Sequence, residues 1–256
     1  MARHLMAGWH KEEKRLKEKY IFIFLDYDGT LTPITARPDK ALLPRKTKDL
    51  LADLSRSRFF KVAVISGRSL KDIKRKIGLP GIIYVGNHGL EIAGGGLHKE
   101  YKAPKGYLPV LKKLKARLLR RLSGMPGVII EDKGLTLTVH YRMARRGARG
   151  IILKNISDAL NFSELDKTLK IALGKKIFEI KPRDGFDKGK VAGWLLNQRV
   201  FPSGKRPARC IYIGDDITDE DAFLYLRGKA LTVSVGKRSG SSAGYYLRDT
   251  SEVTMF

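Results

Sequence analysis

The stretch Tyr20-Ile21-Phe22-Ile23-Phe24-Leu25-Asp26-Tyr27-Asp28-Gly29-Thr30-Leu31 lies near the start of the chain and decides its fold class. Its first six residues have the length and the β-branched and aromatic content that are typical of a buried parallel strand. Two carboxylates, Asp26 and Asp28, and a glycine turn follow this strand directly. In open α/β sheets, reactive groups lie where strands end and loops begin. An Asp at that point can act as a nucleophile, and a second Asp two positions on can transfer a proton. An Asp-Gly turn that only caps the strand is the alternative interpretation.

Strand and helix patterns alternate from residue 20 onward, which predicts an α/β architecture. Apolar runs typical of buried strands recur at residues 59–65, 82–85, 210–213 and 230–235. Helices are expected over residues 45–57 and 188–197, and two more are expected to end near residues 77 and 227.

The middle of the chain has a different pattern. Residues 108–122 predict a basic amphipathic helix, and Asp132-Lys133-Gly134 is a favourable hairpin turn before the alternating strand 135–141. A further helix near 148–160 and strands near 168–172 and 176–180 complete the segment. The expected fold is therefore α/β, with a Rossmann-like parallel-sheet core formed by residues 1–103 and 182–256 and an inserted α+β domain formed by residues 104–181.

Composition sets the broad class of protein. The 256 residues are 43% hydrophobic and 30% charged, which is typical of a globular protein with its own core. No stretch reaches the length of a membrane span and the N-terminus lacks the apolar segment of a signal peptide, so no membrane partner is expected. The single cysteine, Cys210, excludes an intrachain disulfide and favours a cytoplasmic protein.

The net charge of +25 has two interpretations. A strongly basic chain can bind nucleic acid, or its positive field can attract small anionic substrates. Lys and Arg are spread along the whole chain, without the interleaved aromatic residues that bind single strands. We therefore expect a solvated basic surface and no specific nucleic-acid partner.

Four loops at the ends of predicted strands or the start of a predicted helix carry complementary chemistry. The first holds Asp26 and Asp28. The second holds Ser66, whose hydroxyl lies at a strand-to-helix turn where backbone N–H groups can also bind phosphate. Lys188 begins a helix and supplies a cation, and residues 214–221 supply further acids. Together these groups outline a phosphoryl-transfer site.

The last acidic loop also has a structural explanation. Thr218 followed three residues later by Asp221 is an acidic variant of a capping box at a helix N-terminus. This explanation leaves Asp215 and Asp216 unaccounted for at the end of an apolar strand. In a parallel sheet they would lie close to the acids of the first strand and repel them, and a Mg²⁺ ion held by oxygen ligands would remove that repulsion.

In order and approximate spacing, these motifs resemble those of the haloacid dehalogenase-like (HAD) superfamily, and they are most similar to its trehalose-6-phosphate phosphatase family. The resemblance covers about residues 20–249 and leaves the first nineteen residues outside. The stretches that carry it are Asp26-Tyr27-Asp28-Gly29-Thr30-Leu31-Thr32-Pro33-Ile34, Ile65-Ser66-Gly67-Arg68, Gly86-Asn87-His88-Gly89-Leu90-Glu91, Val139-His140-Tyr141-Arg142, Lys181-Pro182-Arg183-Asp184-Gly185-Phe186-Asp187-Lys188-Gly189 and Gly214-Asp215-Asp216-Ile217-Thr218-Asp219-Glu220-Asp221-Ala222-Phe223.

The resemblance implies catalytic roles. Asp26 would attack phosphorus and form an aspartyl-phosphate. Asp28 would protonate the departing sugar oxygen and then activate the hydrolytic water. Ser66 and Lys188 would bind the phosphoryl oxygens.

The resemblance also implies a cofactor and its ligands. Mg²⁺ would be held by Asp26, the backbone carbonyl of Asp28, and Asp215. Asp216 and Asp219 would support the site, the latter beside Lys188.

For the inserted domain, the resemblance implies a cap that closes over the sugar. Its candidate substrate contacts are Glu131, Lys133, Arg142 and Glu179. A solvated hairpin tip is the alternative explanation of Glu131 and Lys133, and the polar side of a strand is that of Glu179. Further candidate substrate contacts in the core are Arg68, Asn87 and His88, and His88 is equally consistent with a structural histidine.

The expected function is Mg²⁺-dependent hydrolysis of trehalose 6-phosphate to trehalose and phosphate, a step of trehalose biosynthesis. The sugar phosphate is the expected small-molecule partner, and a trehalose-phosphate synthase is a candidate protein partner. Another capped HAD sugar-phosphate phosphatase or a phosphohexomutase would use the same chemistry. A basic nucleic-acid-binding protein on an HAD scaffold is the alternative from a different class.

Overall fold

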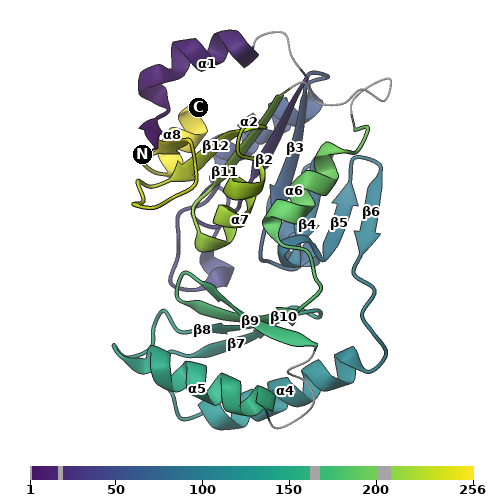
Figure 1. Cartoon of the computed structure of the whole chain (residues 1–256), viewed down its shortest axis with the longest axis vertical. Coiled ribbons are helices and arrows are strands. Elements are labelled where there is room, and N and C mark those ends of the chain that lie inside the picture. The colour runs from purple at the N-terminus through teal and green to yellow at the C-terminus, as the bar shows by residue number, and fades with distance from the viewer. Residues whose placement is uncertain (1, 17–19, 162–167, 201–208) are drawn as a thin grey trace. The chain divides into compact units, whose positions relative to one another are not determined.

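The computed structural model describes residues 2–16, 20–161, 168–200 and 209–256, and its chain forms two compact units (Figure 1). Unit 1 comprises Met1–Glu100 and Phe186–Phe256, and unit 2 comprises Tyr101–Gly185. The chain thus passes between units at 100/101 and 185/186, where the sequence predicts 103/104 and 181/182.

Unit 1 is built on a sheet whose described strands number nine, and most of them are parallel. In spatial order they are β1 (Arg3–His4), β13 (Tyr245–Leu247), β12 (Leu231–Val235), β11 (Arg209–Gly214), β2 (Ile21–Leu25), β3 (Phe60–Ile65), β4 (Ile83–Gly86), β5 (Glu91–Gly94) and β6 (Leu97–Glu100). Neighbours from β1 to β4 pair in parallel, and β5 and β6 add an antiparallel edge. The predicted α/β fold with a parallel-sheet core is confirmed.

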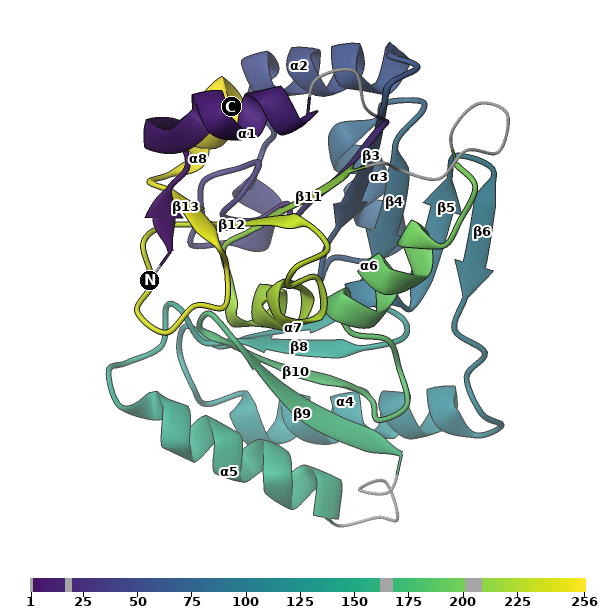
Figure 2. The same cartoon turned by 45° about the horizontal axis from the view of Figure 1, so that its top comes forward.

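Helices cover both faces of this sheet (Figure 2). One face packs against α1 (Trp9–Leu16), α2 (Arg45–Arg56), α3 (Leu70–Ile77) and α8 (Thr250–Met255), and the other against α6 (Lys188–Leu196) and α7 (Ile217–Tyr225). The alternation of side chains along a strand explains the division. Ile21, Ile23 and Leu25 of β2 belong to the first core, whereas Phe22 and Phe24 belong to the second.

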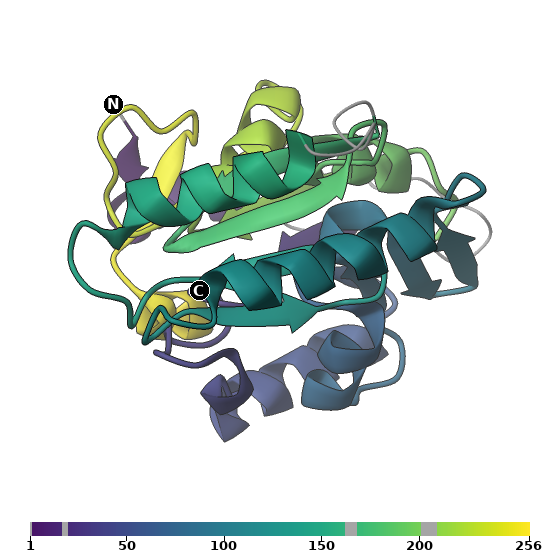
Figure 3. The ribbon, with the colours of Figure 1, turned by 90° about the horizontal axis from the view of Figure 1, so that it is seen from below.

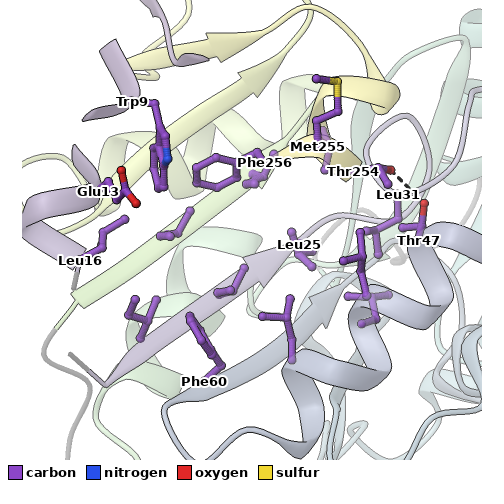
Figure 4. A pocket seen from close by; sticks show the side chains of 18 of the residues that line it. Trp9, Glu13, Leu16, Leu25, Leu31, Thr47, Phe60, Thr254, Met255 and Phe256 are labelled. Atoms are coloured by element: carbon purple, nitrogen blue, oxygen red, sulfur yellow. Dashed lines mark hydrogen bonds between the residues drawn. The ribbon is translucent and has the colours of Figure 1, made fainter. Parts of the chain in front are cut away.

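The N-terminal segment is part of unit 1. The strand β1 pairs with β13, and Trp9 of α1 meets Phe256 edge to face, with ring centroids 4.7 Å apart. Together α1, α2, α8 and the sheet line an open apolar pocket of about 690 Å³ (Figure 4). The sequence predicts a solvated helix or lead-in over residues 11–19. The structure shows a helix that ends at Leu16, while 17–19 lie outside the described residues.

Unit 2 is an α+β unit with one antiparallel sheet (Figure 3). Its strands are β7 (Ile129–Asp132), β8 (Leu137–His140), β10 (Ile177–Pro182) and β9 (Leu169–Gly174), and its helices are α4 (Tyr107–Leu122) and α5 (Ala148–Asn161). Both helices contribute to the apolar core on one face of the sheet. The predicted hairpin is confirmed, because Glu131 of β7 pairs with Thr138 of β8.

Several elements differ from the sequence-based expectations, and β1, β13 and α8 were not predicted. The hairpin of β5 and β6 was not predicted, because Ile92 is the single fully buried side chain of its two short strands and no clear alternation results. The strand β8 ends at His140, and Arg142 lies in the turn that follows. None of the helices in the described part of the chain combines the length and apolarity that a membrane crossing requires.

Candidate active site

Three buried carboxylates of unit 1 come together at the ends of two neighbouring strands. Asp26 follows β2, and its backbone N–H donates to Ile213 of β11 (2.9 Å). Asp215 follows β11 directly, and Asp219 lies in the first turn of α7. One oxygen from each carboxylate lies within 4.8 Å of the others, and none of the three residues is more than 5% exposed.

Lys188 joins two of these carboxylates. It is the first residue of α6, as the sequence predicts, and Asp187 is the N-cap of this helix. Its Nζ donates to Oδ1 of Asp26 and to Oδ1 of Asp219, each at 2.8 Å. Burial alone would lower the pKa of Lys188, but the charges and hydrogen bonds of Asp219 and Asp26 raise it by more. The net shift of the pKa is therefore upward, and the ammonium stays charged.

The electrostatics of this group favour an additional cation. Burial raises the pKa of Asp26 well above its ordinary value, and the charges of Asp219 and Asp215 raise it further, although Lys188 opposes them. Lys188 supplies one positive charge against three carboxylates, and a divalent cation would supply two more. Carboxylate oxygens are the hard donors that Mg²⁺ prefers, so Asp26 and Asp215, with Asp219 beside them, could hold such an ion.

Two glycines allow the carboxylates to lie so close to the backbone. A Cβ on Gly29, whose φ is +90°, would lie 2.3 Å from Cγ of Asp215. A Cβ on Gly214 would lie 2.2 Å from Cγ of Asp219. Both positions therefore require glycine for steric reasons.

Asp216 has a structural task at the start of α7. Its side chain accepts from the backbone N–H of Ile217 (2.7 Å), and its own N–H donates to Oδ2 of Asp219 (3.0 Å) in a capping box. The interpretation of Thr218 and Asp221 as the capping pair was wrong. The helix begins at Ile217, so Thr218 lies inside it rather than at the N-cap.

The predicted Ser66 and His88 lie together at the ends of neighbouring strands. Ser66 follows β3, is 1% exposed, and accepts a backbone hydrogen bond from His88 at its carbonyl (3.0 Å). The imidazole of His88 packs over Gly67, where a Cβ would lie 2.5 Å from Nε2. His88 has a left-handed backbone (φ 55°), which fits a tight turn after β4.

Asn87 stabilises the turn that follows β4. Its side-chain amide donates to Glu91 (2.6 Å), and the same Oε2 of Glu91 accepts from the backbone N–H of Leu70 at the start of α3 (3.2 Å). The side chain of Asn87 is fully buried. These contacts give Asn87 a structural task in the site.

Asp28 and Arg68 form a two-pronged ion pair. Nε and Nη2 of Arg68 donate to the two carboxylate oxygens of Asp28 at 2.8 and 2.7 Å. Arg68 also donates to Asp72 of α3 (2.8 Å) and to the carbonyl of Pro38 (2.7 Å). The guanidinium is nearly buried, whereas the Asp28 side chain is 42% exposed.

In unit 2, candidate residues share one face of the sheet. Glu131, Thr138 and Glu179 occupy one row across β7, β8 and β10. Oε1 of Glu179 lies 3.6 Å from Nζ of Lys133, and Oε2 lies 3.7 Å from Nζ of Lys181. All three side chains of this trio are at most 10% exposed.

Lys181 and His140 were not predicted as members of this group. Nε2 of His140 lies 2.7 Å from Oε2 of Glu131. The two-residue period of a strand could have found both, because Lys181 lies two positions after Glu179 and His140 two after Thr138. Arg142 is not joined to the group by any contact in the described structure. It is exposed and donates to the carbonyl of Lys175 (2.9 Å).

The parallel sheet, with a buried aspartate after β2, a lysine at the start of α6 and acids after β11, defines a phosphatase of the HAD type. A family model described as trehalose-phosphatase matches residues 24–251. The chain therefore belongs to the trehalose-phosphatase family, whose members are hydrolases.

Individual relatives agree with this assignment. The chain is 34% identical over its whole length to a probable trehalose-phosphate phosphatase D of Arabidopsis thaliana and covers 72% of that protein. It is 40% identical to a trehalose-phosphate phosphatase of Mycobacterium tuberculosis over 78% of its length, and it spans only 50% of that relative. The C-terminal domain of the C. albicans trehalose-6-phosphate phosphatase has the same fold, with a TM-score of 0.84 at 24% identity, over 100% of this chain and 96% of that one.

Proposed function

We propose that the chain hydrolyses trehalose 6-phosphate to trehalose and phosphate, with Asp26 as nucleophile and Mg²⁺ as cofactor. One observation carries the proposal: Asp26 is buried, hydrogen-bonded to Lys188 at 2.8 Å and grouped with Asp215 and Asp219. The family to which the chain belongs and the names of its relatives support the choice of substrate.

The first step would transfer the phosphoryl group to the protein. A carboxylate oxygen of Asp26 forms a bond to phosphorus while the bond from phosphorus to the sugar oxygen breaks, leaving an aspartyl-phosphate. Protonated Asp28 gives its proton to the sugar oxygen, so that trehalose leaves as a neutral alcohol.

The second step would regenerate the protein. Asp28, now a carboxylate, takes a proton from water as the water oxygen bonds to phosphorus. The bond between phosphorus and Asp26 breaks, and inorganic phosphate is released.

The remaining groups of unit 1 would bind and orient the phosphoryl oxygens. Lys188 stays cationic and opposes the negative charge that gathers on Asp26 and the phosphate. Ser66 lies at the neighbouring strand end, where its hydroxyl can hold a phosphoryl oxygen.

Asp26, Asp215 and the backbone carbonyl of Asp28 would hold the Mg²⁺. Both oxygens of Asp219 accept hydrogen bonds, from Lys188, Tyr212 and the Asp216 N–H, so Asp219 serves as the support of Lys188. When bound, the ion would screen the charge of the carboxylates and the phosphate from one another.

Unit 2 would recognise the sugar. The hydroxyl groups of a disaccharide need charged donors and acceptors, and the row that includes Glu131 and Glu179, with Lys133 beside it, offers both. Arg142, in the turn after β8, and Lys181 of β10 are further candidate contacts for the sugar.

The test is phosphate release from trehalose 6-phosphate, sucrose 6-phosphate, glucose 6-phosphate and 4-nitrophenyl phosphate, each with Mg²⁺ and with EDTA. We expect Mg²⁺-dependent hydrolysis with a preference for trehalose 6-phosphate. Preference for another ester would overturn the assigned substrate and retain the chemistry. Activity that survives EDTA would overturn the assignment of Mg²⁺ as cofactor. Recovery of an isomeric sugar phosphate in place of free phosphate would identify a mutase.

A further inference from the structure

Arg68 uses most of its hydrogen-bond donors in contacts within the protein. A guanidinium has five N–H groups, and four are used: two on Asp28, one on Asp72 and one on the carbonyl of Pro38. The side chain is 6% exposed, and its face lies 5.3 Å from the ring centroid of Tyr27. This arrangement leaves one N–H donor for a substrate, although the resemblance makes Arg68 a candidate substrate contact.

The same contacts fix the orientation of Asp28. Two parallel N–H···O bonds from one guanidinium set the plane of a carboxylate as well as its distance, which a single ammonium does not do. The Asp28 side chain is nevertheless 42% exposed, so the held carboxylate still faces outward. Each carboxylate oxygen keeps a second lone pair for a proton, so a group held in this way can still take up a proton and pass it to a substrate atom.

Asp72 holds Arg68 in turn. It lies in the first turn of α3, where Ser69 caps the helix by accepting from the Asp72 backbone N–H. Its Oδ2 accepts from Arg68 at 2.8 Å and its Oδ1 from Arg75 at 2.6 Å. A rigid helix is therefore coupled through Asp72 and Arg68 to the loop that follows β2.

We infer that Arg68 is a positioning residue, which orients the Asp28 carboxylate for proton transfer and does not bind the substrate phosphate. The inference rests on the proposed function of Asp28 as proton donor and acceptor. In that role Asp28 passes one proton to the sugar oxygen as its bond to phosphorus breaks, and takes one from water as the aspartyl-phosphate is hydrolysed.

Leaving groups of different basicity separate this role from phosphate binding. An alkoxide such as that of trehalose needs a proton to depart, whereas 4-nitrophenolate leaves without one. The readout is the first turnover, measured by rapid mixing: the nitrophenolate burst for one ester and trehalose release for the other. The variants are Arg68→Met, Arg68→Lys and Asp72→Asn, with Asp28→Asn as reference.

We expect the Arg68 variants to lower the first-turnover rate on trehalose 6-phosphate about 10- to 100-fold, the scale expected of a misplaced catalytic group. The nitrophenolate burst should stay within about 3-fold of the unaltered protein, and the phase after it should slow, because hydrolysis of the aspartyl-phosphate also uses Asp28. Asp72→Asn should show the same pattern more weakly. Arg75→Met is the matched control, since Arg75 also contacts Asp72 but is exposed and does not touch Asp28.

Equal losses on both esters, with a raised KM for each, would overturn the inference and make Arg68 a phosphate ligand. If Asp28→Asn itself fails to distinguish the two esters, the proposed role of Asp28 falls instead. If Asp28→Asn distinguishes them and no Arg68 variant does, only the positioning role falls. Should Arg68→Met not fold, as judged by its melting curve, Arg68→Lys and Asp72→Asn decide the question.

Discussion

The two sets of buried charges lie at different places on their sheets. In unit 1, Asp26 lies at a strand end, and its Oδ1 lies 2.8 Å from Nζ of Lys188. In unit 2, Glu179 lies in the middle of a strand face, 3.6 and 3.7 Å from two lysines. The first distance is that of a charge-assisted hydrogen bond, whereas the other two indicate charge proximity without one.

This difference matches the two tasks proposed for the sets. A group that attacks phosphorus must be held rigidly in one position, and strand ends in a parallel sheet provide converging, well-packed positions for it. A face that recognises a sugar needs several donors and acceptors spread over a wider area, and alternate residues of neighbouring strands provide such a row. Chemistry should therefore depend on unit 1 for every ester, and substrate choice should depend on unit 2.

The largest effect should follow from removal of the nucleophile. We expect Asp26→Asn to lower kcat by at least about 10⁴-fold on trehalose 6-phosphate and on 4-nitrophenyl phosphate alike. Phosphate release measures it, and Asp53→Asn, at an exposed residue paired with Arg56, is the control with unchanged rates. Substantial turnover by well-folded Asp26→Asn would show that the nucleophile lies elsewhere.

Loss of the buried lysine should be the next largest effect. Lys188→Met leaves Asp26 and Asp219 buried without the ammonium, so we expect kcat to fall about 10³-fold on both esters and stability to fall by about 3–5 kcal/mol. Denaturant unfolding gives the second value. Lys190→Met, at a mostly exposed lysine of the same helix, should change neither quantity appreciably.

Substitutions on the face of unit 2 should separate the two esters. We expect Glu179→Gln and Lys181→Met to lower kcat/KM for trehalose 6-phosphate about 10- to 100-fold and to change that for 4-nitrophenyl phosphate by less than about 3-fold. Lys113→Met is the control, because Lys113 is exposed on α4, and α4 packs against the opposite, apolar face of this sheet. Equal losses of kcat/KM on both esters would show that substrate choice does not depend on this face of unit 2.

The smallest effect concerns stability and pH. Because burial raises the pKa of Asp26 in the folded protein, the folded state holds this proton more tightly than the unfolded chain does. Ionisation of Asp26 therefore reduces stability as the pH rises from its ordinary pKa toward the raised one. Mg²⁺ at about 100 times its Kd should add about 2.7 kcal/mol at neutral pH, seen as a higher Tm.

In the absence of Mg²⁺, Asp26→Asn should raise Tm by a few degrees, since it removes one of three buried carboxylates. The same substitution should abolish most of the Mg²⁺-dependent gain, as should Asp215→Asn, while Asp53→Asn should retain it. A Tm that does not respond to Mg²⁺ in the unaltered protein would argue against a metal at these carboxylates.

Much of unit 1 could be predicted because its signals are local. The strand of residues 20–25, Ser66 after β3, Lys188 at a helix start and Asp215 after β11 follow from apolar runs and the residues that end them. A parallel sheet then brings the carboxyl ends of its strands to one edge, so proximity of these groups follows from the fold class. The positions of Asp26, Asp215 and Lys188 in the structure agree with this reasoning.

The contacts between side chains could not be predicted in the same way. The fork of Arg68 on Asp28 joins residues 40 apart, and its length and angle depend on how β2, β3 and α3 pack. The capping pair of α7 was misplaced by two residues because several acids compete for the N-cap. The strand period could have placed Lys181 beside Glu179, but the row formed by Glu131, Thr138 and Glu179 needed the register of β7, β8 and β10.

The sequence by itself determined the fold class, the presence of the strands that carry the acids and the family of the protein, because apolar periodicity and strand-end motifs are properties of short segments. Only the tertiary structure decided how Arg68 is used, which lysines face Glu179, and that β1 and α1 complete unit 1. These features depend on distances between segments far apart in the chain, and those distances are set by packing of the whole core.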